Sequence, residues 1–181
     1  MKRLALLLLL LLVVAIPSVY AVSKQYVAPG TALVLKDSGG AGVLPLNGVG
    51  AGAGKFSDRL DKGTGSQPAT WMWTCTFAFT GTGTVGQTVE VYVSLSDGTS
   101  ADGGLATTNG TLATDKRRNL KFVGVVVMDS SGSNPTITGW GQAYIPTRYF
   151  SNAVWNATSI PFASSANVSS CTFQPYPVEM Q

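Results

Sequence analysis

Short stretches in which apolar and polar residues alternate are the feature that most constrains this chain. Between Trp71 and Phe79, every second residue is aromatic or cysteine, and Met, Thr and Ala lie between them. Successive side chains of a strand point to opposite faces, so this period predicts a strand with one buried face. Further strands are predicted at Val89–Leu95, at Thr136–Ile145 and at Leu120–Met128, the last as a central strand covered on both faces. Many short strands between Gly- and Ser-rich turns predict an all-β protein, a single β-sandwich.

The first residues have the pattern of a signal peptide. Two positive charges, Lys2 and Arg3, precede an unbroken apolar run, and Val19 and Ala21 supply the small residues of a cleavage site. The run is shorter than the about 20 apolar residues that span a bilayer and ends at a proline, which disfavours the alternative of an uncleaved anchor. We therefore expect residues 1–21 to be a cleaved signal peptide. The protein is then secreted or extracellular, at the cell surface, with no stable membrane span after cleavage.

Charged residues are scarce, at 12% of the chain, whereas hydrophobic residues make up 45%. That hydrophobic content argues against a disordered chain. The formal net charge of +3 includes the two charges of the leader, so the processed chain gives no indication of nucleic acid as a partner. The polar surface must consist mainly of Ser, Thr, Asn, Gln and Gly, which hydrogen-bond at any pH, so we expect tolerance of acid.

Cys75 and Cys171 are the two cysteines of the chain. Exported proteins fold under oxidising conditions, so we expect a Cys75–Cys171 disulfide that ties an early strand to the last segment. A bridge that closes so long a loop stabilises by about 4–5 kcal/mol in the chain-entropy model. Two buried thiols are the alternative.

Three Asn-x-Ser/Thr sequences make Asn109, Asn156 and Asn167 candidate N-glycosylation sites. Glycans there would add solvation that the sparse charges do not supply. If the source cannot N-glycosylate, these asparagines are ordinary loop residues.

The chain lacks the side chains of the common catalytic sites. It has no histidine, which removes the Ser-His-Asp triad, the Cys-His pair and His-ligated zinc. Most of its nine acids lie beside Gly or Ser in predicted turns, which disfavours a hydrolase with paired carboxylates. Asp97-Gly98 and Asp102-Gly103 lack the spacing of a calcium loop, and Lys116–Arg118 is best explained as a solvated turn. We therefore expect no enzyme activity, no metal and no cofactor.

Six aromatic residues allow two interpretations. They could form a sugar-stacking platform, as in carbohydrate-binding modules, or they could fill the core. Aromatics that alternate along a strand more often fill a core, so we favour that role. Exposed Trp or Tyr side chains on one sheet face would favour the platform. The six residues are Trp71, Trp73, Trp140, Tyr144, Tyr149 and Trp155.

The segment before the first long strand has a different composition. A short apolar stretch, Thr31–Lys36, is followed by Gly/Ala-rich sequence that includes Gly48–Gly54. Gly/Ala sequence loses much entropy on ordering and can serve as a hinge. We therefore divide the chain into residues 22–56, an N-terminal strand and hinge, and residues 57–181, the β-sandwich domain. An ordinary first strand followed by a loose loop is the alternative.

In organisation, the chain resembles donor-strand surface filament subunits, such as archaeal bundling pili and threads and the TasA/camelysin-type biofilm fibre proteins. The resemblance covers the signal peptide, the stretch around Thr31–Lys36 and the β-rich remainder. It implies a jelly-roll-like sandwich whose groove receives the N-terminal strand of the next subunit, which builds a homopolymer. The candidate donor residues are Thr31, Ala32, Leu33, Val34, Leu35 and Lys36.

The sequence therefore predicts a structural subunit of an extracellular pilus or filament, with a role in adhesion and biofilm. Surface glycans are a further candidate partner. A secreted carbohydrate-binding β-sandwich module and a viral coat protein are the alternatives.

Overall fold

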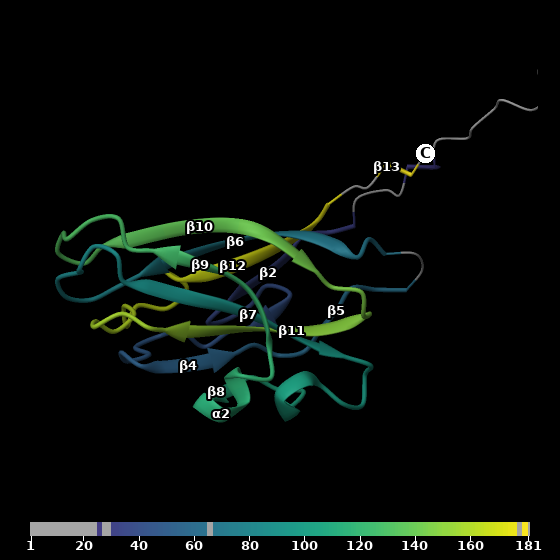
Figure 1. The fold of residues 1–181 in the computed structure, drawn as a ribbon, viewed down its shortest axis with the longest axis horizontal. Helices are drawn as coiled ribbons and strands as arrows, with labels where there is room; N and C mark the ends of the chain where they lie inside the picture. The colour runs from purple at the N-terminus through teal and green to yellow at the C-terminus, as the bar shows by residue number, and fades with distance from the viewer. Residues whose placement is uncertain (1–24, 27–29, 65–66, 177–178, 181) are drawn as a thin grey trace, which may run out of the picture.

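The computed structural model describes residues 25–26, 30–64, 67–176 and 179–180, so the predicted signal peptide lies outside the described residues. Two sheets, antiparallel apart from one short parallel pair, pack face to face (Figure 1). This arrangement confirms the predicted all-β sandwich. A separate pair of short strands, β1 (Gln25–Tyr26) and β13 (Glu179–Met180), joins the two ends of the described chain. Within these residues, no helix has the length and apolar character to cross a bilayer.

The first sheet, called the β6 sheet here, has the strand order β10-β6-β12-β2-β3. Its strands are β10 (Thr136–Tyr144), β6 (Thr70–Ala78), β12 (Ser170–Pro175), β2 (Leu33–Lys36) and β3 (Gly42–Val43). All its neighbours are antiparallel except β2 and β3, which are parallel.

The second sheet, called the β7 sheet, has the order β8-β4-β11-β7-β9, and β5 pairs with one end of β11. Its strands are β8 (Gly110–Leu112), β4 (Ala53–Phe56), β11 (Tyr149–Asn156), β7 (Thr88–Ser96), β9 (Lys121–Val127) and β5 (Leu60–Asp61). The connection from β7 to β9 contains β8 and two short helices, η2 (Asp102–Gly104) and α2 (Thr114–Arg117).

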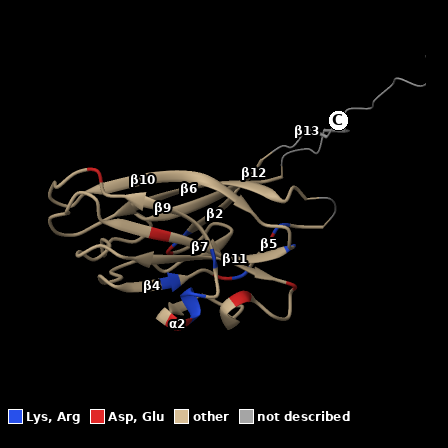
Figure 2. Cartoon of the chain, viewed as in Figure 1, with Lys and Arg blue, Asp and Glu red and all other residues tan. Residues whose placement is uncertain are grey.

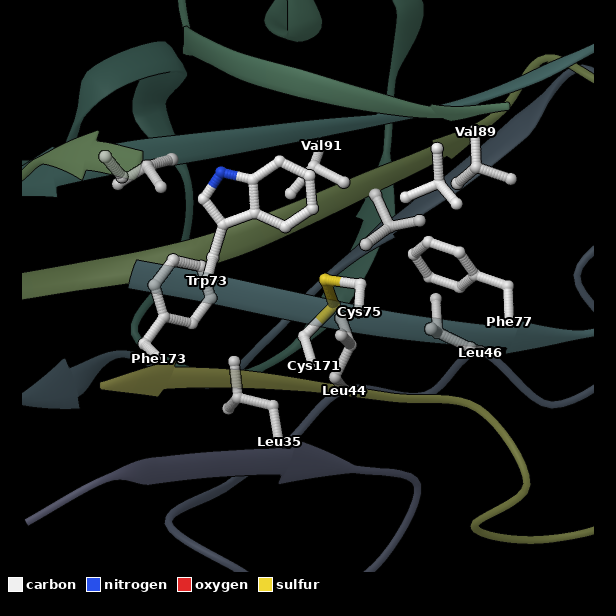
Figure 3. Close-up of a cluster of buried hydrophobic side chains, with 14 of the residues drawn as sticks. Leu35, Leu44, Leu46, Trp73, Cys75, Phe77, Val89, Val91, Cys171 and Phe173 are labelled. Carbon is white, nitrogen blue, oxygen red and sulfur yellow. A yellow bond between two sulfur atoms is a disulfide. The ribbon is translucent and has the colours of Figure 1, made fainter. Parts of the chain in front are cut away.

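The core lies between the sheets, where the alternation of the two long strands places their apolar sides. Trp73 and Phe77 of β6 and Val91 of β7 are fully or almost fully buried there (Figure 3). Cys75 and Cys171 lie opposite each other on β6 and β12 and form a disulfide across 96 residues of sequence. The predicted disulfide is therefore confirmed, and it lies inside the core rather than at the surface.

On one side of the sandwich the edge strands β9 and β10 approach each other without forming a ladder among the described pairings. A β-carbon on Gly139 of β10 would lie 2.6 Å from a methyl of Val126, and one on Gly141 would lie 2.9 Å from the ring of Trp73. Close packing therefore explains these two glycines. The position of β9 also corrects the expectation of a central strand, because Phe122 and Val127 of β9 are exposed.

On the opposite side, Asp58 links the two sheets. Its carboxylate accepts hydrogen bonds from the backbone of Val43 at 2.9 Å and from Asn109 at 2.8 Å. Val43 belongs to the edge of the β6 sheet, and Asn109 leads into the edge strand of the β7 sheet. Desolvation raises the pKa of Asp58, but these hydrogen bonds outweigh it and leave the pKa below its ordinary value.

The N-terminal strand is part of the sandwich in this structure. β2 pairs with β12 on one side and β3 on the other, and Leu35 is fully buried in the core. Thr31 and Ala32 precede this strand, and β4 lies in the other sheet. Strands from the predicted segment 22–56 thus contribute to both sheets, with no boundary at residue 57. A donor role would require Leu33–Lys36 to leave the place that it occupies in its own sheet.

Candidate functional site

The two outer faces of the sandwich differ in whether another segment of the chain covers them. Part of the outer face of the β7 sheet, over β11 and β4, is covered by the β7–β9 connection, which lies below it in Figure 1. Leu105 and Leu120 of this connection pack with Trp155 of β11 in a second apolar cluster, separate from the main core. The guanidinium of Arg117 lies 4.3 Å from the centre of the Trp155 ring, and only 8% of Trp155 is exposed. This outer face therefore has its own small core.

The outer face of the β6 sheet has no such cover among the described residues. Three aromatic residues on this face are exposed, with exposed fractions of 72% for Trp140, 57% for Tyr144 and 45% for Tyr176. Trp140 and Tyr144 come from β10. Tyr176 follows β12 directly, and its backbone N–H donates to the carbonyl of Thr70 at 3.0 Å, which continues the pairing of β12 with β6. All three aromatic side chains belong to the outward set of their strands.

The strand register arranges the outward residues in parallel rows across β10, β6 and β12, and three neighbouring rows contain the exposed aromatics. The first row is Tyr144–Thr70–Tyr176, the second is Gln142–Met72–Gln174, and the third is Trp140–Thr74–Thr172. Strands are spaced about 4.8 Å apart and alternate residues about 6.8 Å, so the three rows cover about 10 Å by 14 Å. We call these nine residues the open face.

The open face carries no charged side chain. Figure 2 shows the charged residues mainly on the β7 sheet, on α2 and in loops, whereas β10, β6 and β12 carry none. One cation reaches the rim, because Lys121 of β9 donates from Nζ to the carbonyl of Tyr144 at 2.7 Å. Its ammonium lies 4.9 Å from the centre of the Tyr144 ring. A surface of aromatic rings between uncharged amides and hydroxyls suits a neutral, hydroxyl-rich ligand.

The six aromatic residues for which the sequence allowed two roles are partly buried and partly exposed in the structure. Trp71, Trp73 and Trp155 are buried, in agreement with a core role. Tyr149 is half-buried at the end of the sandwich, with the guanidinium of Arg148 4.9 Å from its ring centre. Only Trp140 and Tyr144 lie together on an exposed sheet face, which is the arrangement that favours the platform.

Sequence reasoning missed Tyr176. The pattern that could have found it is the alternation along β12, in which Cys171, Phe173 and Pro175 are buried. The residues between them must face outward, and continuing the period by one step places Tyr176 on the same side as Gln174.

The structure treats the three candidate glycosylation sites unequally. Asn156 is fully buried and its amide nitrogen donates to three backbone carbonyls, so a glycan there is incompatible with this fold and that prediction is corrected. The amide of Asn109 donates to Asp58 at 2.8 Å. Asn167 is exposed in a turn, where its side-chain oxygen accepts from the backbone of Ser38 at 2.9 Å. Asn167 is therefore the most accessible of the three.

The acidic and basic residues singled out by the sequence have structural roles. Asp97 accepts hydrogen bonds from the backbones of Thr99 and Ser100, both at 2.7 Å, and these bonds lower its pKa. Within the described ranges, no three His, Cys, Asp or Glu side chains are grouped so as to hold a metal. The basic cluster differs from the expected solvated turn, because Arg117 packs on Trp155 and pairs with Glu90 at 2.9 Å.

Comparison with known proteins gives no family. No family model matches the chain, and no curated protein matches it. One solved structure that matches holds the CBM22-1 and GH10 modules of the endo-1,4-β-D-xylanase 10B of Clostridium thermocellum, complexed with xylohexaose. The identity is 12% and the TM-score 0.35, over 87% of this chain and 30% of that chain. A similarity this low carries no argument about function.

Proposed function

We propose that this protein is an exported, non-enzymatic module that binds carbohydrate on the open face. The observation that carries the proposal is the exposure of Trp140, 72%, beside Tyr144 on the open face, whose three strands carry no charged residue. Burying a large aromatic side chain stabilises a protein by about 1.5–3 kcal/mol, and the β7 sheet does bury its outward tryptophan. Exposed apolar patches of this kind mark interaction sites.

The chemistry of the open face selects the ligand class. Aromatic rings offer flat apolar surfaces that pack against the C–H faces of sugar rings, and amides and hydroxyls exchange hydrogen bonds with sugar hydroxyls. Burying a charged ligand against these nine residues would leave its charge without a partner, which costs free energy. A neutral glycan needs no such partner.

The cellular context agrees with a ligand outside the cell. The predicted signal peptide would export the chain, and the disulfide suits an oxidising compartment. Export brings the open face into contact with the polysaccharides of surfaces and matrices, in line with the glycan partner predicted from the sequence.

Binding of neutral polysaccharides by the processed protein tests the proposal. We would measure retardation in gels that contain soluble β-glucan, xylan, mannan or glycol chitin, and then titrate the best ligand calorimetrically. Trp140→Ala/Tyr144→Ala, which removes both exposed rings of β10, should weaken binding at least tenfold. Phe122→Ala is the matched control, because Phe122 is an exposed aromatic of the β7 sheet. Wild-type protein that binds none of the four polymers, or a Trp140→Ala/Tyr144→Ala variant that binds as well as wild type, would refute the proposal.

Assembly into a filament is a second candidate, and the edge strands favour it. β9 and β10 each end a sheet, and β9 exposes Phe122, Val125 and Val127 without an internal proline. Long apolar edges of this kind can pair with another chain. Donation of Leu33–Lys36 would instead need two copies to exchange β2 at its place beside β12.

A covalent lock separates these two modes of assembly. Val34 and Thr172 are opposite residues of β2 and β12, so Val34→Cys/Thr172→Cys would tie β2 to its own sheet. Electron microscopy of the oxidised variant should show no filaments if β2 is exchanged, with Val34→Ser/Thr172→Ser as the control. Filaments that persist would assign assembly to the edges, and wild-type protein that forms none would remove the filament function.

A further inference from the structure

We infer that the ligand is an extended chain of several neutral sugar units that lies across β10, β6 and β12, with Tyr144 and Tyr176 contacting two different units. This inference rests on the proposed carbohydrate function and adds the length and direction of the ligand. It also makes Tyr176, from the end of β12, a binding residue.

The first row of the open face sets the direction. Tyr144 and Tyr176 flank Thr70, with Tyr144 opposite it on β10 and Tyr176 joined to its carbonyl by a 3.0 Å hydrogen bond. Two strand spacings separate the tyrosines by about 10 Å. That span is wider than one sugar ring, so a monosaccharide can contact only one tyrosine. A chain that crosses the strands can contact both.

The second row lies beside the first and has the same symmetry. Gln142 and Gln174 are exposed on either side of Met72, which is half-buried on the central strand. Each glutamine offers one acceptor and two donor hydrogens, so both ends of the row can bind sugar hydroxyls. The methionine supplies an adaptable apolar floor between them. The aromatic rings of the first row and the amides of the second row thus run side by side in the same direction across the sheet.

The two ends of that line differ, which gives the ligand an orientation. At the β10 end, the Lys121 ammonium lies over the Tyr144 ring at 4.9 Å and donates to the Tyr144 carbonyl. It covers one face of the ring and so leaves the other for stacking. Lys121 lies at the β10 rim, and Lys36 of β2 lies opposite Ser170, outside the nine residues, so no cation stands within the open face itself.

Chain-length dependence is the test of this inference. Oligosaccharides of one to six units, made from the polymer that binds best in gels, would be titrated into wild-type protein. Affinity should rise at least tenfold from the monosaccharide to a chain that reaches both tyrosines. Tyr176→Ala should remove most of that gain, so that the longest chain binds little better than the monosaccharide. Tyr176→Phe, which keeps the ring, should preserve the gain, and Phe122→Ala should change nothing.

The outcomes separate this inference from the proposed function. If Trp140→Ala/Tyr144→Ala weakens binding but Tyr176→Ala does not change the length dependence, the face binds sugar and the crossing geometry is wrong. If a monosaccharide binds as tightly as the longest chain, the extended ligand is also wrong. A preference for polygalacturonate over every neutral polymer would overturn the neutral class. Failure of wild-type protein to bind any polysaccharide would overturn the proposed function itself.

Discussion

Two tryptophans on the two outer faces have opposite surroundings. Trp155 on β11 and Trp140 on β10 both point away from the main core, yet 8% of the first and 72% of the second is exposed. Trp155 lies over Gly54, whose missing side chain leaves room for the ring, and the β7–β9 connection covers it. No described segment does the same for Trp140. An outward tryptophan is therefore buried or exposed according to what crosses its face.

The cover of the β7 sheet is held by polar contacts as well as by packing. Arg117 of α2 pairs with Glu90 at 2.9 Å, and the hydroxyl of Tyr92 donates to Glu90 at 2.6 Å. Burial raises the pKa of Tyr92 to about 12, and the hydrogen bond to Glu90 adds to the shift. These contacts keep the connection on the sheet. Among the described residues, no segment is attached to the open face in this way, and its aromatic rings are exposed.

Removing the disulfide should have the largest effect on stability. The bridge joins β6 and β12, in the sheet whose outer face no described segment covers. Cys75→Ala/Cys171→Ala should lower the free energy of unfolding by about 4 kcal/mol. Denaturant unfolding measures that loss. Hydrogen exchange should show β6 and β12 losing protection before β7 and β11, and earlier exchange in the β7 sheet would contradict the assignment.

Removing the two tryptophans in turn tests the comparison directly. Trp155→Ala should cost about 3 kcal/mol, because it empties a packed cluster. Trp140→Ala should change the free energy of unfolding by less than about 0.5 kcal/mol, as exposed substitutions do. Both values come from denaturant unfolding at neutral pH. Equal losses would mean that the two faces do not differ in the solution state.

Adding a methyl group beneath Trp155 probes the covered face more gently. A β-carbon on Gly54 would lie 2.7 Å from the Trp155 ring and 2.7 Å from the carbonyl oxygen of Val154. Gly54→Ala should therefore cost about 2 kcal/mol by overpacking. Gly132→Ala is the control, since no atom lies within 4 Å of its β-carbon. A Gly54→Ala variant as stable as wild type would show that Trp155 and the β7–β9 connection move easily to accommodate the added methyl group.

Lowering the pH should have the smallest effect on stability, and that effect should arise at Asp61 in the β7 sheet. Hydrogen bonds from Arg148 and from the Gly63 amide lower the pKa of Asp61 from 3.8 to about 2. A carboxyl whose pKa is lowered by folding stabilises the protein above its ordinary pKa, and that contribution disappears as pH falls through about 2. Both side chains are nearly half exposed, so the effect should be small. Unfolding followed from pH 5 to pH 2 should show it, and Asp61→Asn should remove it.

Local patterns in the sequence predicted much of the fold but only part of the site. The alternation at Trp71–Phe79 predicted β6 to within one residue, and two cysteines in an exported chain predicted the bridge. Asn156 and Asn167 stand in equivalent sequons, yet one is buried and the other exposed. Their difference depends on backbone carbonyls supplied by distant segments.

The sequence by itself determined the β class, the disulfide and the absence of charge from β10, β6 and β12, because period and composition are properties of the chain alone. Only the tertiary structure decided that Trp140, Tyr144 and Tyr176 share one exposed face while Trp155 is covered. Strand order and register bring together residues that are far apart in sequence. Whether a connection crosses a sheet face depends on the path of the whole chain, which no local pattern contains.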